Sequence, residues 1–150
     1  MMYYLGLKSN FKKDLKMEIG LFIGFVSFFF TAIALVIVFL YLYAIVTPYD
    51  DYKLIFEENN LAAALGFGGA VIGVSIPLYS ALVHSVSYID FAIWGAIAIL
   101  IQLIFAFIVT RRSGKYSFKT EISNGAIPVG TLMAFLSISI GLLNAGSMSY

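Results

Sequence analysis

Few side chains of this sequence can act as an acid or base or bind a metal ion, and half of the eight carboxylates stand close together. The chain has 150 residues with no cysteine and a single histidine, His84. Four carboxylates share one short stretch without histidine, serine or threonine: Asp50, Asp51, Glu57 and Glu58. The cysteine count excludes a disulfide, a thiolate metal site and a cysteine nucleophile, and one histidine cannot form a histidine cluster. We therefore expect no enzyme, no metal site and no cofactor.

A second group of polar side chains is isolated inside long apolar runs. Gln102 is the most costly of them, because hydrocarbon offers an amide no water to bond. Pro77 removes one backbone hydrogen bond from its helix and frees the carbonyl of Gly73. Together these residues predict a polar interior or permeation pathway formed by Gln102, Ser75, Pro77, Ser80, Ser139 and Asn144. Bonding between helices, with a kink at the proline, is the alternative explanation.

The elements that must position these residues are membrane-spanning helices. Hydrophobic residues make up 61% of the chain and charged residues 11%, whereas about a quarter of a soluble domain is charged. Uncharged runs cover residues 19–46, 61–89, 91–110 and 122–150, and each exceeds the roughly 18 residues that mark a span. We predict an all-α integral membrane protein with four spans in a single membrane domain, residues 1–150.

The uncharged runs also bear on processing and function. The first run has 28 residues, whereas the apolar core of a cleavable signal peptide has about 7–15, so we interpret it as a retained span. None of the four runs contains Asp, Glu, Lys or Arg. Proton relays and coupled pumps usually need such charges inside the membrane, so a pump is disfavoured.

The sequence contains an internal repeat. Residues 32–81 align without a gap to residues 96–145, and fourteen of the fifty pairs are identical. Repeat one covers about residues 19–82 and repeat two about residues 88–146, each a hairpin of two helices. An even number of spans returns the chain to its starting side, so the two hairpins are parallel repeats.

Small residues recur at helical spacing in the second and fourth spans. They predict close helix packing through Ala62, Gly66, Gly69, Ala70, Gly73, Gly130, Ala134 and Gly141. The spans that follow the loops also begin with residues that favour helix starts. We expect helix caps at Asn59, Asn60, Asp90 and Asn124.

Four spans place both termini on one side and the loops at residues 47–60 and 111–121 on the other. Four lysines precede the first span and the two loops hold five basic residues, so charge does not choose the orientation. The first loop carries a net charge of −3 and the second of +3. These opposite charges predict that the two loops pair, either within one subunit or between neighbouring subunits in head-to-tail assembly, or dock a partner. The residues are Asp50, Asp51, Glu57, Glu58, Arg111 and Arg112, and a solvated surface is the alternative.

Several motifs stand in a specific order along the chain. They are Thr47-Pro48-Tyr49-Asp50-Asp51-Tyr52-Lys53-Leu54-Ile55, Asn59-Asn60-Leu61-Ala62-Ala63-Ala64-Leu65, Ile76-Pro77-Leu78, Trp94-Gly95, Gln102 and Leu143-Asn144-Ala145-Gly146-Ser147-Met148-Ser149-Tyr150. In these the chain resembles the YjfL-like family of small bacterial inner-membrane proteins, the domain of unknown function 350. The resemblance implies a multi-pass protein of the bacterial cytoplasmic membrane without an established activity. It also implies an association with soluble membrane-stress proteins.

The sequence thus favours a non-enzymatic, oligomeric membrane protein that acts as a scaffold or docking subunit. Its partners are the lipid bilayer, further copies of the chain and a soluble membrane-stress protein, with no nucleic acid. The alternative function is a small channel or passive permeation pathway for an ion or small solute.

Overall fold

Every regular element in the described part of the chain is a helix. The computed structural model describes residues 2–112 and 117–148, with side chains from residue 12 onward. The helices are α1 (Met2–Val46), α2 (Asp51–Phe56), α3 (Leu61–His84), α4 (Tyr88–Arg111), α5 (Phe118–Ser123) and α6 (Ile127–Ser147). Of these, α1, α3, α4 and α6 are long and apolar enough to cross a membrane. The predicted all-α fold with four membrane-spanning helices is therefore confirmed.

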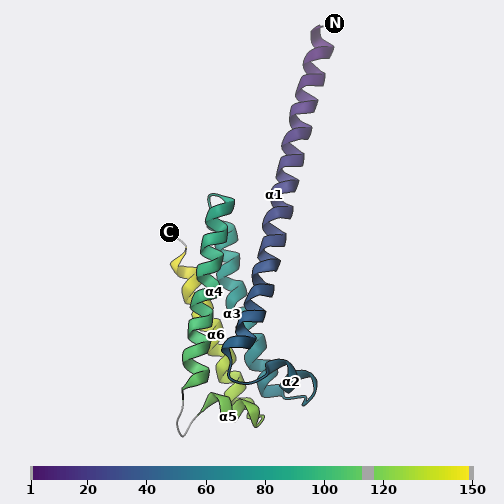
Figure 1. The fold of residues 1–150 in the computed structure, drawn as a ribbon. Coiled ribbons are helices and arrows are strands. Elements are labelled where there is room, and N and C mark those ends of the chain that lie inside the picture. The colour runs from purple at the N-terminus through teal and green to yellow at the C-terminus, as the bar shows by residue number, and fades with distance from the viewer. Residues whose placement is uncertain (1, 113–116, 149–150) are drawn as a thin grey trace.

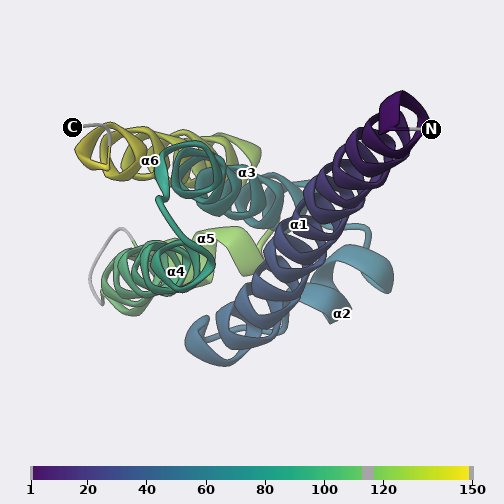
Figure 2. The ribbon, with the colours of Figure 1, turned by 90° about the horizontal axis from the view of Figure 1, so that it is seen from above.

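The helices α3, α4 and α6 form a bundle, and α1 leans against it with its C-terminal half (Figure 1). Seen from above, α3 and α6 lie side by side, and α1 runs along the side away from α6 (Figure 2). The start of α1 and the end of α6 point to the same end of the molecule, and α2 and α5 lie at the other end (Figure 1). Both connecting loops therefore reach the same side.

The closest helix pair is α3 and α6, and glycines allow it. A Cβ atom added to Gly130 would overlap the carbonyl oxygen of Ala62, and one added to Gly141 would overlap the carbonyl oxygen of Gly73. Near the middle, a Cβ on Gly69 would overlap the backbone of Ala134. Because lipid tails are as apolar as leucine, helices in a membrane associate through such close van der Waals packing.

The C-terminal half of α1 completes an apolar core with α3 and α4. Phe39 and Tyr43 of α1 are fully buried against Val74 of α3 and Ala106 of α4. The preceding part of α1 projects past the bundle, and Leu21 there is 71% exposed. Its uncharged run would be about 42 Å long, more than the roughly 30 Å hydrocarbon core, so α1 must tilt or extend beyond the bilayer.

The two short helices close the end of the bundle where the loops lie. Leu54 of α2 and Ile122 of α5 pack with Ala63 and Met133 in a second buried cluster. Both short helices have six residues and stand between two long ones, α2 between α1 and α3 and α5 between α4 and α6. This order fits two hairpins of the same design, and the sequence repeat itself stays a prediction.

The start of α3 is capped by Asn60. Its Oδ1 accepts a hydrogen bond from the backbone N–H of Ala63 at 3.0 Å, and its Nδ2 donates to the carbonyl oxygen of Ile122 at 2.8 Å. Asn59 was also expected to cap this helix, and that prediction is wrong. It has a φ of 50°, a left-handed conformation that asparagine tolerates better than most residues, so it forms the turn before the cap.

The caps predicted for the last two spans are displaced. The N-cap of α4 is Ser87, and Asp90 lies three residues further on, where its carboxylate accepts a hydrogen bond from the N–H of Val86 at 3.1 Å. The hydroxyl of Ser87 accepts a hydrogen bond from the N–H of Asp90 at 3.2 Å, so the pair resembles a capping box, except that the carboxylate bonds the residue before the cap. Asn124 ends α5, and α6 starts after Ala126 without a side-chain cap.

We predict that Gly73→Ala weakens the α3–α6 pair, whereas Gly68→Ala on the same helix does not. The new methyl group at position 73 would lie 2.5 Å from the carbonyl oxygen of Ser137, and no atom lies within 4 Å of the position at Gly68. Overpacking of this kind costs about 1–3 kcal/mol. Denaturation in mixed detergent micelles measures the free energy of unfolding of each variant. Equal free energies for Gly73→Ala and Gly68→Ala would contradict the close contact at Gly73.

Candidate functional site

An interior polar group joins three of the long helices. The side chain of Gln102 on α4 is only 1% exposed, and its Nε2 donates a hydrogen bond to the carbonyl oxygen of Ser137 on α6 at 3.2 Å. The same nitrogen would lie 2.6 Å from a Cβ atom at Gly73 of α3. Gln102 therefore lies where α3, α4 and α6 meet, and the absent side chain of Gly73 provides its space.

Other predicted polar residues lie nearer the end of the bundle where α3 ends. Ser80 is buried and donates a hydrogen bond from its hydroxyl to the carbonyl oxygen of Ala145 on α6 at 3.0 Å. Nδ1 of His84 lies 2.9 Å from the carbonyl oxygen of Ser80. Pro77 and Asn144 are also buried, and α3 is one helix from Leu61 to His84 despite the proline.

Two serines assigned to this interior face outward, so that part of the prediction is wrong. Ser75 and Ser139 are exposed, and their hydroxyls donate to the carbonyl oxygens of Val71 and Phe135, each at 2.7 Å and four residues earlier. A serine that bonds to its own helix needs no partner across the bundle, so it can face lipid. Ser137 is buried beside Gln102 instead, and the repeat did not single it out.

The interior group leaves some hydrogen-bonding capacity unused. Oε1 of Gln102, Oγ of Ser137 and Nδ2 of Asn144 are buried without a partner among the described residues. All three groups are neutral, and the described residues hold no cluster of three or more His, Cys, Asp or Glu that could bind a metal ion. The amides of Gln102 and Asn144 and the hydroxyl of Ser137 can donate and accept hydrogen bonds, but they cannot act as an acid or a base near neutral pH.

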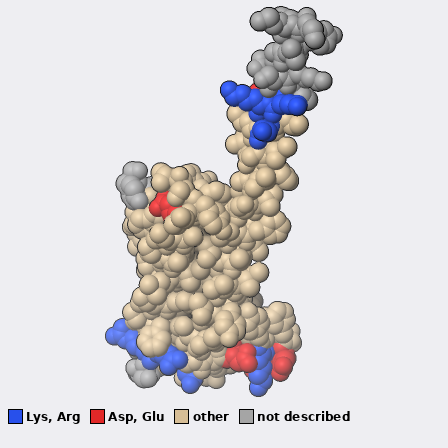
Figure 3. Space-filling view, turned by 45° about the horizontal axis from the view of Figure 1, so that its top comes forward, with Lys and Arg blue, Asp and Glu red and all other residues tan. Residues whose placement is uncertain are grey.

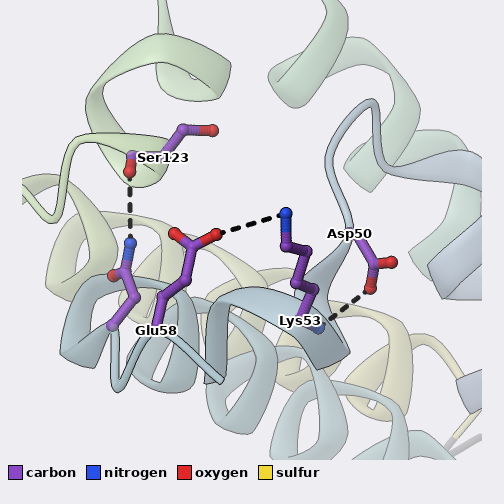
Figure 4. Close-up of polar contacts among 5 residues, drawn as sticks. Asp50, Lys53, Glu58 and Ser123 are labelled. Carbon is purple, nitrogen blue, oxygen red and sulfur yellow. Dashed lines mark hydrogen bonds and ion pairs between the residues drawn. The ribbon is translucent and has the colours of Figure 1, made fainter. Parts of the chain in front are cut away.

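Charged side chains gather at the ends of the molecule, and at the loop end one side is basic while the other carries acidic patches with a basic patch between them (Figure 3). On the acidic side, the carboxylate of Asp50 accepts a hydrogen bond from the backbone N–H of Lys53 at 3.0 Å and so caps α2. The ammonium group of Lys53 lies 3.7 Å from a carboxylate oxygen of Glu58 (Figure 4). Both side chains of this ion pair are exposed, so it adds little stability.

Asp51 was predicted to dock a partner, and the structure corrects this because its side chain is only 1% exposed. The hydroxyl of Thr47 donates a hydrogen bond to Oδ2 at 2.7 Å, and Oδ1 has no partner among the described residues. Burial raises the pKa of Asp51 to about 6, although the Thr47 hydrogen bond opposes the shift and the charge of Asp50 adds to it. Burial, and then the Asp51 charge, also raises the pKa of Tyr49.

On the basic side, the first arginine is held at the end of α4. Nε of Arg111 donates to the carbonyl oxygen of Val46 at 3.4 Å, and its guanidinium carbon lies 4.9 Å above the ring of Phe107. Arg112 follows as the C-cap residue of α4 and is exposed. Within the described residues, no salt bridge joins the acidic loop to the basic one. Asn60 connects the acidic loop to α5 instead, because its Nδ2 donates to the carbonyl oxygens of Ile122 and Ser123. The dashed line to Ser123 in Figure 4 marks the second of these bonds.

Four apolar helices with charges confined to the ends define a multi-pass membrane protein. The chain belongs to the family described as Domain of Unknown Function (DUF350), whose sequence model matches residues 17–148. It is 36% identical to the UPF0719 inner membrane protein YjfL of Escherichia coli (strain K12) over 129 residues, which cover 85% of this chain and 95% of the relative. It is 23% identical to the UPF0719 transmembrane protein YshE of Bacillus subtilis (strain 168) over 122 residues, or 81% and 90% of the two chains.

No solved structure matches the chain. The names of the relatives and the four apolar helices together identify a multi-pass inner-membrane protein. The predicted family and location are therefore confirmed.

We predict that Asp51→Asn removes one pH-dependent part of the stability. The pKa of Asp51 is raised from 3.8 to about 6, so between these values the folded protein holds a proton that the unfolded chain has lost. Its contribution is therefore full below about pH 4, falls as the pH rises to about 6 and is then constant. The asparagine keeps an acceptor for Thr47 without a charge. The free energy of unfolding of the variant should therefore increase relative to that of the wild type as the pH rises from 4 to 7.

Denaturant unfolding in detergent at several pH values measures this difference. Glu57→Gln is the matched control, because Glu57 is an exposed carboxylate in the same loop. A constant difference between Asp51→Asn and the wild type over this pH range would contradict the prediction.

Proposed function

We propose that this protein is a non-enzymatic, oligomeric membrane scaffold whose loop end docks a soluble membrane-stress protein. The observation that carries the proposal is the distribution of charge. From residue 19 onward, Asp90 and Arg111 are the charged residues (Asp, Glu, Lys or Arg) of the spans, and they lie at the two ends of α4. Acidic and basic side chains gather instead at the loop end. Exposed charged side chains also stand at the start of α1, from Lys12 to Glu18, and we assign docking to the loop end because an exposed aromatic pair accompanies the charges there.

The acidic half of this surface also offers an apolar contact. Phe56 at the end of α2 is 76% exposed, and its ring lies parallel to that of Tyr52 with the centroids 6.4 Å apart. The exposed carboxylates Asp50, Glu57 and Glu58 stand on either side of this aromatic pair in the sequence. An aromatic centre with a charged rim is the usual composition of a protein-binding surface.

Oligomer formation is proposed on two grounds. First, the acidic and basic loops form no described salt bridge with each other within one chain, so each is free to meet the opposite loop of a neighbouring copy. Second, the long helices expose large side chains such as Phe25, Phe135 and Leu143 on several sides, and neighbouring copies can cover these in the plane of the membrane. Residue 115, a lysine of the basic loop, lies outside the described residues.

The second candidate function is the small channel. Three buried polar atoms without partners, on Gln102, Ser137 and Asn144, favour it because they could bind a passing ion or water. The close approach of Gly73, Ser137 and Gln102 opposes it, since not even a methyl group fits between them. The outward positions of Ser75 and Ser139 remove two of the predicted pathway residues. We therefore place the scaffold first.

We predict that the soluble partner binds less tightly when the exposed acids are neutralised together by Asp50→Asn, Glu57→Gln and Glu58→Gln. Three rim charges at about 0.5 kcal/mol each lower the affinity about tenfold. The measurement is quantitative co-purification with the full chain in nanodiscs. Asp14→Asn with Glu18→Gln, two exposed acids at the opposite end, is the matched control. Undiminished capture by the triple variant would contradict docking through the acidic surface.

We further predict that reconstituted protein gives no ion or small-solute flux that depends on Gln102. Liposomes with the wild type and with Gln102→Leu should release a trapped dye or dissipate a potassium gradient at the same background rate. The leucine removes the hydrogen bond to Ser137, worth about 1 kcal/mol in membranes, and preserves side-chain volume. A wild-type flux that falls about tenfold or more in Gln102→Leu would overturn the scaffold in favour of the channel.

A further inference from the structure

A small polar pocket lies at the loop end of α4, away from the acidic surface. It has a volume of about 220 Å³ and lies between the end of α1, the end of α4 and the start of α5. Six residues line it: Pro48, Thr110, Arg111, Arg112, Ser117 and Lys119. Half of these lining residues carry a positive charge and none is acidic.

None of the three cations forms a salt bridge within the described residues. The salt bridge of the described residues joins Lys53 to Glu58, and neither of these residues lines the pocket. All three side chains are exposed, so water screens their mutual repulsion, but three like charges around one concave surface still attract an anion. The macrodipole of α4 explains a cation at its last residue, Arg111, but not Lys119, which belongs to α5. The pocket is therefore poised for an anion.

The positions of the hydrogen-bond donors narrow the kind of anion. The ring of Phe107 and the carbonyl oxygen of Val46 hold the Arg111 guanidinium in place, and only its Nε is used in that hydrogen bond. Its terminal amino groups remain as a planar pair of donors, the geometry that matches two oxygens of a phosphate. The Ser117 hydroxyl accepts a bond from the N–H of Thr120, so its hydrogen is left to donate.

The depth of the pocket indicates where such a phosphate comes from. Arg111 is the last residue of the apolar helix α4, and Val46 is the last residue of α1. The pocket is thus level with the ends of two spans, where the phosphates of lipid headgroups lie. Basic pockets between membrane helices at this level are the usual binding sites for anionic headgroups.

We propose that this pocket binds the phosphate of an anionic phospholipid, with Arg111, Arg112 and Lys119 neutralising it and Ser117 donating a hydrogen bond. The lipid approaches laterally from the bilayer, so its acyl chains remain beside the apolar ends of α1 and α4. The site is separate from the proposed partner docking, which uses the acidic side of the same membrane face. It competes with the proposed contact between copies, because the same cations would meet the acidic loop of a neighbour.

The test uses the full chain in a neutral detergent with three probes: phosphatidylglycerol, phosphatidylcholine and inorganic phosphate. Native mass spectrometry counts retained lipids, and thermal unfolding gives an apparent affinity from the stabilisation by each probe. We expect phosphatidylglycerol to bind more tightly than phosphatidylcholine. Arg112→Gln with Lys119→Gln should weaken it about tenfold or more, because charge-assisted bonds to phosphate are lost.

Two matched variants separate a lost site from a damaged fold. Lys53→Gln removes a cation of the same membrane face that lies outside the pocket, and it should leave phosphatidylglycerol binding unchanged. Arg112→Lys with Lys119→Arg keeps both charges and should retain binding within a few-fold.

Four results would overturn the proposal. They are equal binding of the two lipids, full binding by the double glutamine variant, equal losses in that variant and in Lys53→Gln, and binding of inorganic phosphate without a preference for phosphatidylglycerol. The last result would assign the pocket to a free anion. If lipid binding is absent but the soluble partner is still captured, the lipid proposal fails and the docking proposal holds. If the partner is not captured but phosphatidylglycerol still binds, the docking proposal fails and the lipid proposal holds.

Discussion

The close contact between the backbones of α3 and α6 is the constraint on which the rest of the molecule depends. In water, burial of apolar surface would drive these helices together, but in lipid that drive is absent and short-range packing must replace it. Gly130 and Gly141 bring the backbone of α6 onto the carbonyl oxygens of Ala62 and Gly73. The other helices then arrange around this pair: α4 packs on both members, and α1 reaches the bundle mainly through α3 and α4.

The same contact determines where polar groups can be tolerated. Because Gly73 has no side chain, the amide of Gln102 fits against α3 and reaches the carbonyl oxygen of Ser137 across the bundle. A buried amide in hydrocarbon is costly unless it is bonded, so Gln102 fixes the rotation of α4 relative to α6. The polar interior therefore depends on the close packing of α3, α4 and α6. A function in permeation would need this packing to open.

Features that depend on composition or on side-chain size could be predicted from the sequence, and features that depend on local geometry could not. The spans followed from the absence of charge, and the tight helix pair from the spacing of residues such as Gly130 and Gly141. Gly66 was expected in the same close contact, but only ordinary side-chain contacts with Met133 and Ile122 lie near it. The outward rotation of Ser75 did not follow, because a serine bonded to its own helix satisfies itself in either orientation. Asp51 looked like a surface acid in sequence, and only the fold of α2 against Thr47 shows that it is buried.

Charge is excluded from the spans and the bundle is closed at its centre, so the chemistry of recognition is concentrated at the loop end. There the exposed acids flank α2, most of the bases lie at the end of α4 and in α5, and the neutral side chain of Asn60 joins the two regions. A salt bridge across that boundary would have cancelled both charges. The absence of one among the described residues leaves two surfaces of opposite sign on one membrane face, and these can bind different partners at the same time.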